Sequence, residues 1–174
     1  MSNILTIILA AGRGTRMKSN KTKVLHKVGG KPMIKHVIDN VQDLSSQIVV
    51  VIGYQGQKIK EELNNNKVAY VKQKKQLGTG HAVLQARDYI RSHNGPVLVL
   101  CGDTPLVSEK SLSTLIKAHN EEKAAVTVLT AIVDNPTGYG RIMRDKNEYI
   151  TEIIEEKDAT LKEKINDEIN TGIY

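Results

Sequence analysis

The chain has 174 residues, enough for one domain of ordinary size with its own core. Its six Tyr, with no Phe or Trp, predict an aliphatic core and disfavour a base-stacking surface for single-stranded nucleic acid. The single cysteine, Cys101, excludes a disulfide framework and a cysteine-based zinc site, and it suits a reducing, cytoplasmic setting. No apolar run approaches the roughly 20 residues that span a membrane, and the N-terminus does not resemble a signal peptide.

The net charge of +6 is unevenly distributed along the chain. No Asp or Glu precedes Asp39, whereas ten carboxylates lie between Asp134 and Glu168. The basic residues before Asp39 are Arg13, Arg16, Lys18, Lys21, Lys23, Lys27, Lys31 and Lys35. Such a segment suits a polyanionic ligand, although most Lys-rich segments are simply solvated. Because this one surrounds a glycine-containing loop after an apolar run, we favour phosphate binding.

The first elements in the chain are an apolar run at 4–9, typical of a strand buried on both faces, and a loop at 10–22. Pro32 can open a helix, and Thr79 and Ser108 are suitable N-caps for two others. The predicted helices are 33–44, 55–63, 79–91 and one that begins at 108. The remaining predicted strands are 47–52, 68–71, 97–100, 124–133, a hairpin of 141–144 with 149–154, and a segment from 169 onward.

This alternation of strands and helices predicts an α/β, Rossmann-like three-layer fold, with a mainly parallel sheet and helices on both faces. In such sheets, ligands bind outside the carboxyl ends of the strands. We therefore expect the loops at Ala10, Gly53, 73–80 and 102–105 to gather at one edge.

The loop Leu9-Ala10-Ala11-Gly12-Arg13-Gly14-Thr15-Arg16-Met17 carries the first chemical signal. Its glycines let backbone N–H groups approach an anion, while Arg16 and the nearby Lys23 offer positive charge to phosphate oxygens. Met17 occupies the third glycine position of a dinucleotide-binding loop, and no Gly-Lys-Ser/Thr of a P-loop is present. By itself, the loop predicts only a phosphate-binding turn after a strand.

Further segments extend the pattern over essentially the whole chain. They are Lys23-Val24-Leu25-His26, Gln76-Leu77-Gly78-Thr79-Gly80-His81-Ala82, Gly102-Asp103-Thr104-Pro105-Leu106, Pro136-Thr137-Gly138-Tyr139-Gly140-Arg141-Ile142, Glu155-Glu156-Lys157-Asp158-Ala159 and Glu168-Ile169-Asn170-Thr171-Gly172. In order and spacing, they resemble the pyrophosphorylase domain of the bacterial bifunctional UDP-N-acetylglucosamine pyrophosphorylase/glucosamine-1-phosphate N-acetyltransferases, the GlmU family.

The resemblance implies a uridylyltransferase of cell-wall precursor synthesis. N-acetylglucosamine 1-phosphate would attack the α-phosphate of UTP in line, with Mg²⁺, to give UDP-N-acetylglucosamine and pyrophosphate. The sugar phosphate would be the nucleophile, which agrees with the absence of a Ser/His/Asp or Cys/His constellation. We expect no nucleic-acid or membrane partner.

The resemblance also implies roles for individual residues. Nucleotide contacts would come from the backbone of Leu9, Ala10, Ala11 and Gly12, from the charges of Arg16 and Lys23, and from Gln73, Gly78 and Thr79 at the uracil. Asp103 would hold Mg²⁺, and Gly140, Glu155 and Asn170 would contact the sugar and its acetamido group. Without the resemblance, Gln73 would be better explained as a surface residue. Thr79 suits a helix cap and can serve both roles. For Asp103 the alternative is a turn residue, but the buried strand before it and the basic loop that it should face favour a metal ligand.

Two residues depart from the family pattern: Thr22 stands where proline is common, and Cys101 where tyrosine is common. We expect Thr22 to loosen its loop and Cys101 to pack as a small apolar residue. In the family, the domain continues past the position of Tyr174. A second metal ligand, the acetyltransferase β-helix, the acetyl-CoA site and the homotrimer contacts would lie there, so we expect an incomplete domain of weak or no activity.

Three alternatives stay open from the sequence. The first is another nucleotidyltransferase, which uses a different sugar phosphate or base. The second is a dinucleotide-dependent oxidoreductase, disfavoured by Met17 and by the lack of an acidic residue for ribose at the end of a second strand. The third is a basic nucleic-acid-binding module, disfavoured by the scarcity of aromatic residues.

Overall fold

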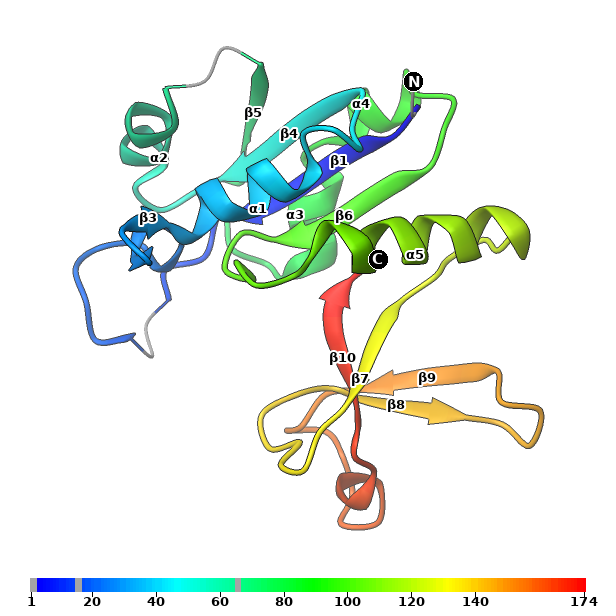
Figure 1. The fold of residues 1–174 in the computed structure, drawn as a ribbon. Coiled ribbons are helices and arrows are strands. Elements are labelled where there is room, and N and C mark those ends of the chain that lie inside the picture. Colours follow the sequence, from blue (N-terminus) through cyan, green and yellow to red (C-terminus); the bar gives the residue numbers. More distant parts are fainter. Residues whose placement is uncertain (1–2, 15–16, 65–66) are drawn as a thin grey trace.

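A four-stranded parallel sheet forms the centre of the larger lobe in the computed structural model, which describes residues 3–14, 17–64 and 67–174 (Figure 1). In spatial order its strands are β5 (Val68–Lys72), β4 (Gln47–Ile52), β1 (Leu5–Ala10) and β6 (Val97–Cys101). All three pairings are parallel, and Ile8 of β1 lies opposite both Val50 and Leu100. The first strand of the chain is therefore an interior strand of the sheet.

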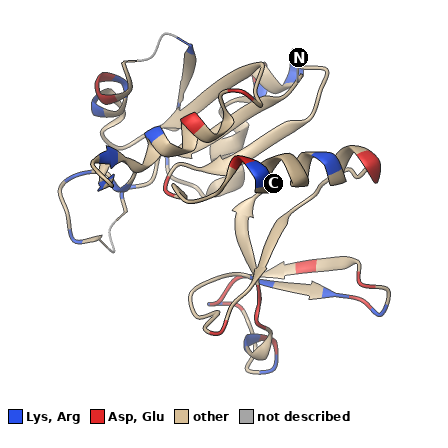
Figure 2. Ribbon diagram, viewed as in Figure 1, with Lys and Arg blue, Asp and Glu red and all other residues tan. Residues whose placement is uncertain are grey.

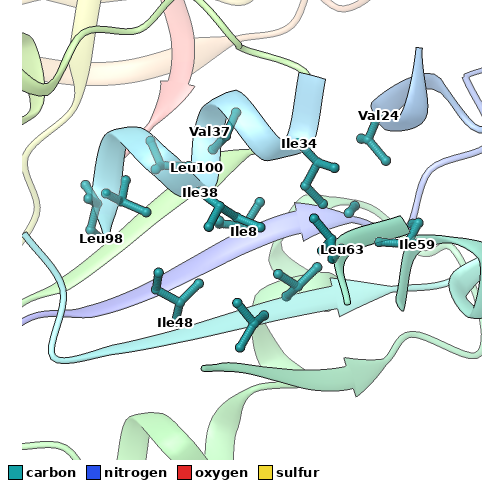
Figure 3. Packing of buried hydrophobic residues seen from close by; sticks show 14 of the residues in the cluster. Ile8, Val24, Ile34, Val37, Ile38, Ile48, Ile59, Leu63, Leu98 and Leu100 are labelled. Atoms are coloured by element: carbon teal, nitrogen blue, oxygen red, sulfur yellow. The ribbon is translucent and has the colours of Figure 1, made fainter. Parts of the chain in front are cut away.

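Helices cover both faces of this sheet, as the sequence predicts. One face packs against α1 (Met33–Val41), α2 (Gly56–Leu63) and α5 (Glu109–Glu121), and the other against α3 (Thr79–Leu84) and α4 (Arg87–Arg91). Figure 3 shows Ile8 of β1 beneath Ile34 and Ile38 of α1 on the first face. Ile7 points to the opposite face, against Ala82 and its neighbours. Successive residues of β1 face opposite layers, which explains why the strand is apolar throughout.

The second lobe is an antiparallel sheet, which lies beside the end of β6 (Figure 1). In spatial order its strands are β7 (Leu129–Ile132), β10 (Glu168–Ile173), β8 (Arg141–Arg144) and β9 (Ile150–Ile154). The predicted hairpin is confirmed as β8 and β9. The register of β10 against β7 shifts between Asn170 and Ile173, and Ile173 still pairs with Leu129 of β7. Tyr174 then exchanges two backbone hydrogen bonds with Val99 of β6, at 2.7 and 3.0 Å, and so connects the two lobes.

Short elements complete the fold. They are the 3₁₀ turns η2 (Lys23–Leu25) and η3 (Glu163–Ile165) and the paired strands β2 (Lys27–Val28) and β3 (Lys31–Pro32). Of the helices among the described residues, none combines the length and the apolar character needed to cross a bilayer.

Several predicted boundaries were wrong. The helix predicted at 79–91 is two helices, because the backbone leaves helical geometry at Ala86 (φ −94°, ψ 11°), whose side chain is fully buried. Thr79 is the first helical residue and not the N-cap; Gly78 precedes it with φ +100°. The strand predicted at 124–133 is restricted to β7, since β10 offers a partner only over that range. The Ser108 cap is confirmed, because its hydroxyl accepts the Ser111 N–H at 3.1 Å.

The position of β1 generates a stability prediction. Ile8→Ala should lower the free energy of unfolding by about 2–5 kcal/mol, because Ile8 is fully buried between two strands and a helix. Ile132→Ala, at a side chain that is 77% exposed on β7, should change it by less than about 0.5 kcal/mol. Urea denaturation followed by circular dichroism measures both variants, and equal losses would contradict the assignment of the core.

Candidate functional site

A cavity of about 410 Å³ opens at the carboxyl end of the parallel sheet, between the loop after β1 and the end of β6. Its lining residues are Leu9, Ala10, Gly12, Gly14, Met17, Lys23, Val24, Cys101 and Asp103. Five of the predicted site residues thus lie around one cavity, together with Gly14 and Met17 of the same loop: Leu9, Ala10, Gly12, Lys23 and Asp103. A second cavity, of about 450 Å³ between β6 and α5, is lined mainly by apolar side chains and by no Asp, Glu, Lys or Arg.

The two sides of the loop after β1 pack closely against each other at Gly14 and Lys23. Gly14 has φ +66°, and a Cβ atom there would lie 2.6 Å from the Cβ of Lys23, so a larger residue would force the loop open. The loop carries Lys and Arg but no Asp or Glu (Figure 2). Arg16, predicted to neutralise the triphosphate, lies outside the described residues.

Thr22 does not loosen this loop, contrary to the expectation from the sequence. Its side chain is fully buried, its Oγ1 donates to the Gly12 carbonyl at 3.3 Å, and its backbone N–H donates to Gln55 Oε1 at 3.0 Å. Proline, with neither an N–H nor a hydroxyl, could make neither hydrogen bond. Hydrogen bonds therefore fix this segment in the present chain.

Lys23 and Asp103 form an ion pair at the cavity, with 2.5 Å between Nζ and Oδ2. Their side chains are 43% and 27% exposed, so solvent screens the attraction and the pair contributes little to folding stability. The two loops are held together by the Gly102 N–H, which donates to the Leu9 carbonyl at 2.9 Å. An ammonium group and a carboxylate thus face the same cavity. An anionic ligand there could compete for Lys23, and a cation could compete for Asp103.

The fit of a divalent cation can be judged from the donors present. No group of three or more His, Cys, Asp or Glu side chains that could hold a metal occurs among the described residues. Asp103 offers a single carboxylate at the cavity. That donor set fits Mg²⁺, which is commonly bound by one or two carboxylates together with substrate phosphates and water.

Cys101 also lines the cavity. Burial, and to a smaller extent Asp103, raise the pKa of its thiol to about 11, while Lys23 acts in the opposite direction. Its small side chain also permits a close approach of β10, since a Cβ at Gly172 would lie 3.3 Å from its Sγ. The expectation that Cys101 packs as a small residue agrees with this contact.

Gln73 is buried, at 3% exposure, although three lysines surround it in sequence. Its Nε2 donates to the Gly78 carbonyl at 3.2 Å and contacts His81 Nδ1 at 2.9 Å. The alternative that Gln73 is a surface residue is therefore wrong. Gln73 and Gly78 are brought together, whereas neither they nor Thr79 line the 410 Å³ cavity.

The three residues predicted to bind the sugar meet in the antiparallel lobe. The Asn170 N–H donates to the Gly140 carbonyl at 2.9 Å, and a Cβ at Gly140 would lie 3.5 Å from Glu155 Oε1 and 3.6 Å from Asn170 Cβ. The Asn170 amide is oriented on both sides, since Oδ1 accepts the Gly172 N–H at 2.9 Å and Nδ2 donates to the Tyr174 hydroxyl at 2.7 Å. Gly172 in turn contacts Cys101, which links this cluster to the cavity wall.

The neighbouring carboxylates Glu155 and Glu156 differ in their surroundings. Glu156 accepts the Gly138 N–H and pairs with the buried Arg141 at 2.8 Å, and these hydrogen bonds lower the pKa of the Glu156 carboxyl. Among the described residues, Glu155 makes no side-chain hydrogen bond and is exposed. The structure therefore leaves Glu155 available to a ligand and uses Glu156 to hold the β8 segment.

Gln55 is a site residue that the sequence did not reveal. It follows β4, and its side chain reaches the backbone of residues 20 and 22 in the loop after β1. A lone glutamine after a strand carries no sequence signal for this contact, because the partner lies 33 residues earlier in the chain.

Solved structures of low sequence identity share the fold. A Bacillus anthracis protein described as a glucose-1-phosphate thymidylyltransferase superimposes with a TM-score of 0.82 at 24% identity, covering 98% of this chain and 70% of that one. A UDP-glucose pyrophosphorylase complexed with UDP-glucose gives 0.80 at 19% identity, covering 99% and 75%. These likenesses confirm the predicted three-layer nucleotidyltransferase fold.

Proteins found by sequence comparison share a larger fraction of identical residues with this chain than these solved structures do. The bifunctional protein GlmU of Listeria welshimeri is 48% identical to this chain, and that of Halalkalibacterium halodurans is 50% identical. Each alignment covers 100% of this chain and 38% of the relative, so the chain spans well under half the length of these proteins. Residues 6–162 match the family model described as the MobA-like NTP transferase domain. The chain belongs to the MobA-like NTP transferase domain family.

Proposed function

We propose that this chain catalyses uridylyl transfer from UTP to N-acetylglucosamine 1-phosphate, which forms UDP-N-acetylglucosamine and pyrophosphate for cell-wall precursor synthesis. The observation that carries the proposal is the Lys23–Asp103 pair, which faces a cavity at the carboxyl ends of β1 and β6. Membership of an NTP transferase family supports the reaction type. The identity of 48–50% to bifunctional GlmU proteins over the whole chain supports the choice of substrates.

The reaction needs positioned charge more than a protein nucleophile. A phosphate oxygen of the sugar phosphate forms the new bond to the α-phosphorus of UTP, and the bond from that phosphorus to the β-phosphate bridging oxygen breaks. Pyrophosphate leaves with the bonding electron pair. Lys23 would neutralise charge on the triphosphate and on this leaving group, together with Arg16. The backbone of Leu9 to Gly12 would hold the nucleotide at the strand end.

Asp103 would hold Mg²⁺ at this site, where the ion would draw negative charge from the phosphate oxygens. In the structure, Lys23 pairs with the same carboxylate. Nucleotide phosphates that attract Lys23 would therefore leave Asp103 free for the cation, so the two ligands should bind together.

Recognition of the base and the sugar is assigned to two separate groups. Gln73, Gly78 and Thr79 would read uracil, with Gln73 holding the segment through the Gly78 carbonyl. Gly140, Glu155 and Asn170 would bind the sugar, and the fixed Asn170 amide suits a hydroxyl or acetamido partner. Residues 1–174 would belong to the pyrophosphorylase domain of a longer protein, whose acetyltransferase β-helix domain would form a homotrimer.

The substrate assignment predicts a preference in a pyrophosphate-release assay. With Mg²⁺ and UTP, kcat/KM for N-acetylglucosamine 1-phosphate should exceed that for glucose 1-phosphate by at least about tenfold, because a site that hydrogen-bonds a polar substituent rejects analogues without it. UTP should likewise be preferred to other nucleoside triphosphates. Equal values for the two sugars would contradict the substrate and favour a transferase for another sugar phosphate.

The roles of Lys23 and Asp103 predict large losses of turnover on substitution. Lys23→Ala and Asp103→Ala should each slow kcat at least about tenfold, because each removes a charge next to the reacting phosphates. Lys31→Ala and Asp39→Ala are matched controls, since this surface ion pair lies on β3 and α1 and does not line the cavity. A normal rate in either site variant would remove the role assigned to that residue.

A further inference from the structure

We propose that the turn Gly53-Tyr54-Gln55, which follows β4, clamps the phosphate loop (described residues 11–14 and 17–23) at both ends and thereby positions Lys23. We call these three residues the 53–55 turn. The inference rests on the proposed function, because it assigns the turn a part in binding the triphosphate. It adds a positioning element from a strand whose residues do not line the cavity.

The first end of the phosphate loop contacts the 53–55 turn through its backbone. The Tyr54 N–H donates to the Ala11 carbonyl at 3.3 Å. A Cβ atom at Gly53 would lie only 2.7 Å from the same carbonyl oxygen, so the approach requires glycine at that position. The guanidinium carbon of Arg13 lies 5.2 Å from the centroid of the Tyr54 ring, within the range of a cation–π contact.

The second end of the loop is held by the side-chain amide of Gln55, which forms hydrogen bonds with backbone groups of the loop. Gln55 Oε1 accepts the Thr22 N–H at 3.0 Å, and Gln55 Nε2 donates to the Asn20 carbonyl at 2.7 Å. One amide group therefore satisfies two backbone groups of the loop. Because Thr22 Oγ1 also donates to the Gly12 carbonyl, the two ends of the loop are connected to each other as well as to the turn.

The backbone conformation of Gln55 supports a positioning role for its side chain. The residue adopts a left-handed conformation, φ 52° and ψ 29°, directly before α2. That conformation is costly for a glutamine and is favoured by glycine or asparagine. Neither of those residues could reach both Asn20 and Thr22, so a glutamine at this position combines an unfavourable backbone with the side-chain length that the clamp requires.

Lys23 is the residue whose position depends on this arrangement. It follows the clamped Thr22 directly, and its Cβ packs against Gly14 on the opposite side of the loop. Its Nζ then reaches Asp103 across the cavity. If the clamp were released, the ammonium group would sample a wider region, and binding of the triphosphate would weaken more than binding of the sugar phosphate.

Gln55→Asn tests the clamp, because asparagine keeps the amide and tolerates the left-handed backbone but is one methylene shorter. We expect KM for UTP to rise about fivefold or more, with KM for N-acetylglucosamine 1-phosphate within about twofold of the unaltered protein. Without nucleotide, trypsin should cleave faster after Lys18 and Lys21, which are exposed in the loop. Gln57→Asn is the matched control. Gln57 is exposed, and its side chain donates to Glu61 on the same helix and, among the described residues, to no residue of the loop.

Gln55→Gly provides a second variant that should fold, because glycine accepts the left-handed conformation without strain. It should reproduce both effects. The clamp is overturned if KM for UTP is unchanged in both variants, even with faster cleavage, or if both KM values rise equally. If neither the unaltered protein nor a version extended past residue 174 turns over UTP, the proposed function fails. The clamp is then supported if UTP binding, measured by calorimetry, weakens by about fivefold or more in both variants, and refuted if UTP binding is unchanged.

Discussion

The parallel pairing of β1 with both β4 and β6 is the constraint on which the site depends. Pairing in continuous register brings the ends of these strands to one edge, and the hydrogen bond from the Gly102 N–H to the Leu9 carbonyl extends the pairing into the loops. Lys23 and Asp103, 80 residues apart in the chain, meet only because of this edge. The fully buried side chains of Ile7 and Ile8 anchor the strand on both faces, so the core and the site share one element.

A second connection joins the edge of the parallel sheet that carries the 410 Å³ cavity to the antiparallel lobe. β10 pairs with β7 and β8, shifts its register against β7 between Asn170 and Ile173, and continues as a partner of β6 at Tyr174. At this register shift Gly172 lies against Cys101, and its N–H fixes the Asn170 amide. Bulges of this kind commonly re-aim side chains near functional sites. One strand, β10, therefore connects the proposed sugar-binding cluster to the wall of the 410 Å³ cavity.

The ion pair at the cavity contributes less to folding stability than the ion pair in the antiparallel lobe. The Lys23–Asp103 pair is partly exposed and weak, whereas the Arg141–Glu156 pair has a buried guanidinium and holds β8 to the segment after β9. The loop after β1 has no carboxylate of its own to neutralise its cations. A triphosphate would meet positive charge there and would compete with Asp103 for Lys23.

The sequence by itself determined the fold class, the strand at 4–9, the hairpin, the basic character of the first loop and the gathering of that loop and Asp103 at the strand ends. Alternation, apolar runs and glycines are local signals, so neighbouring residues suffice to detect them. Only the tertiary structure decided that Gln73 is buried, that Thr22 is held by hydrogen bonds, that the helix at 79–91 breaks at Ala86 and that Gln55 reaches the phosphate loop. Each of these depends on a partner or a packing surface contributed by a distant segment, because hydrogen bonds and burial are properties of the assembled sheet and not of the local sequence.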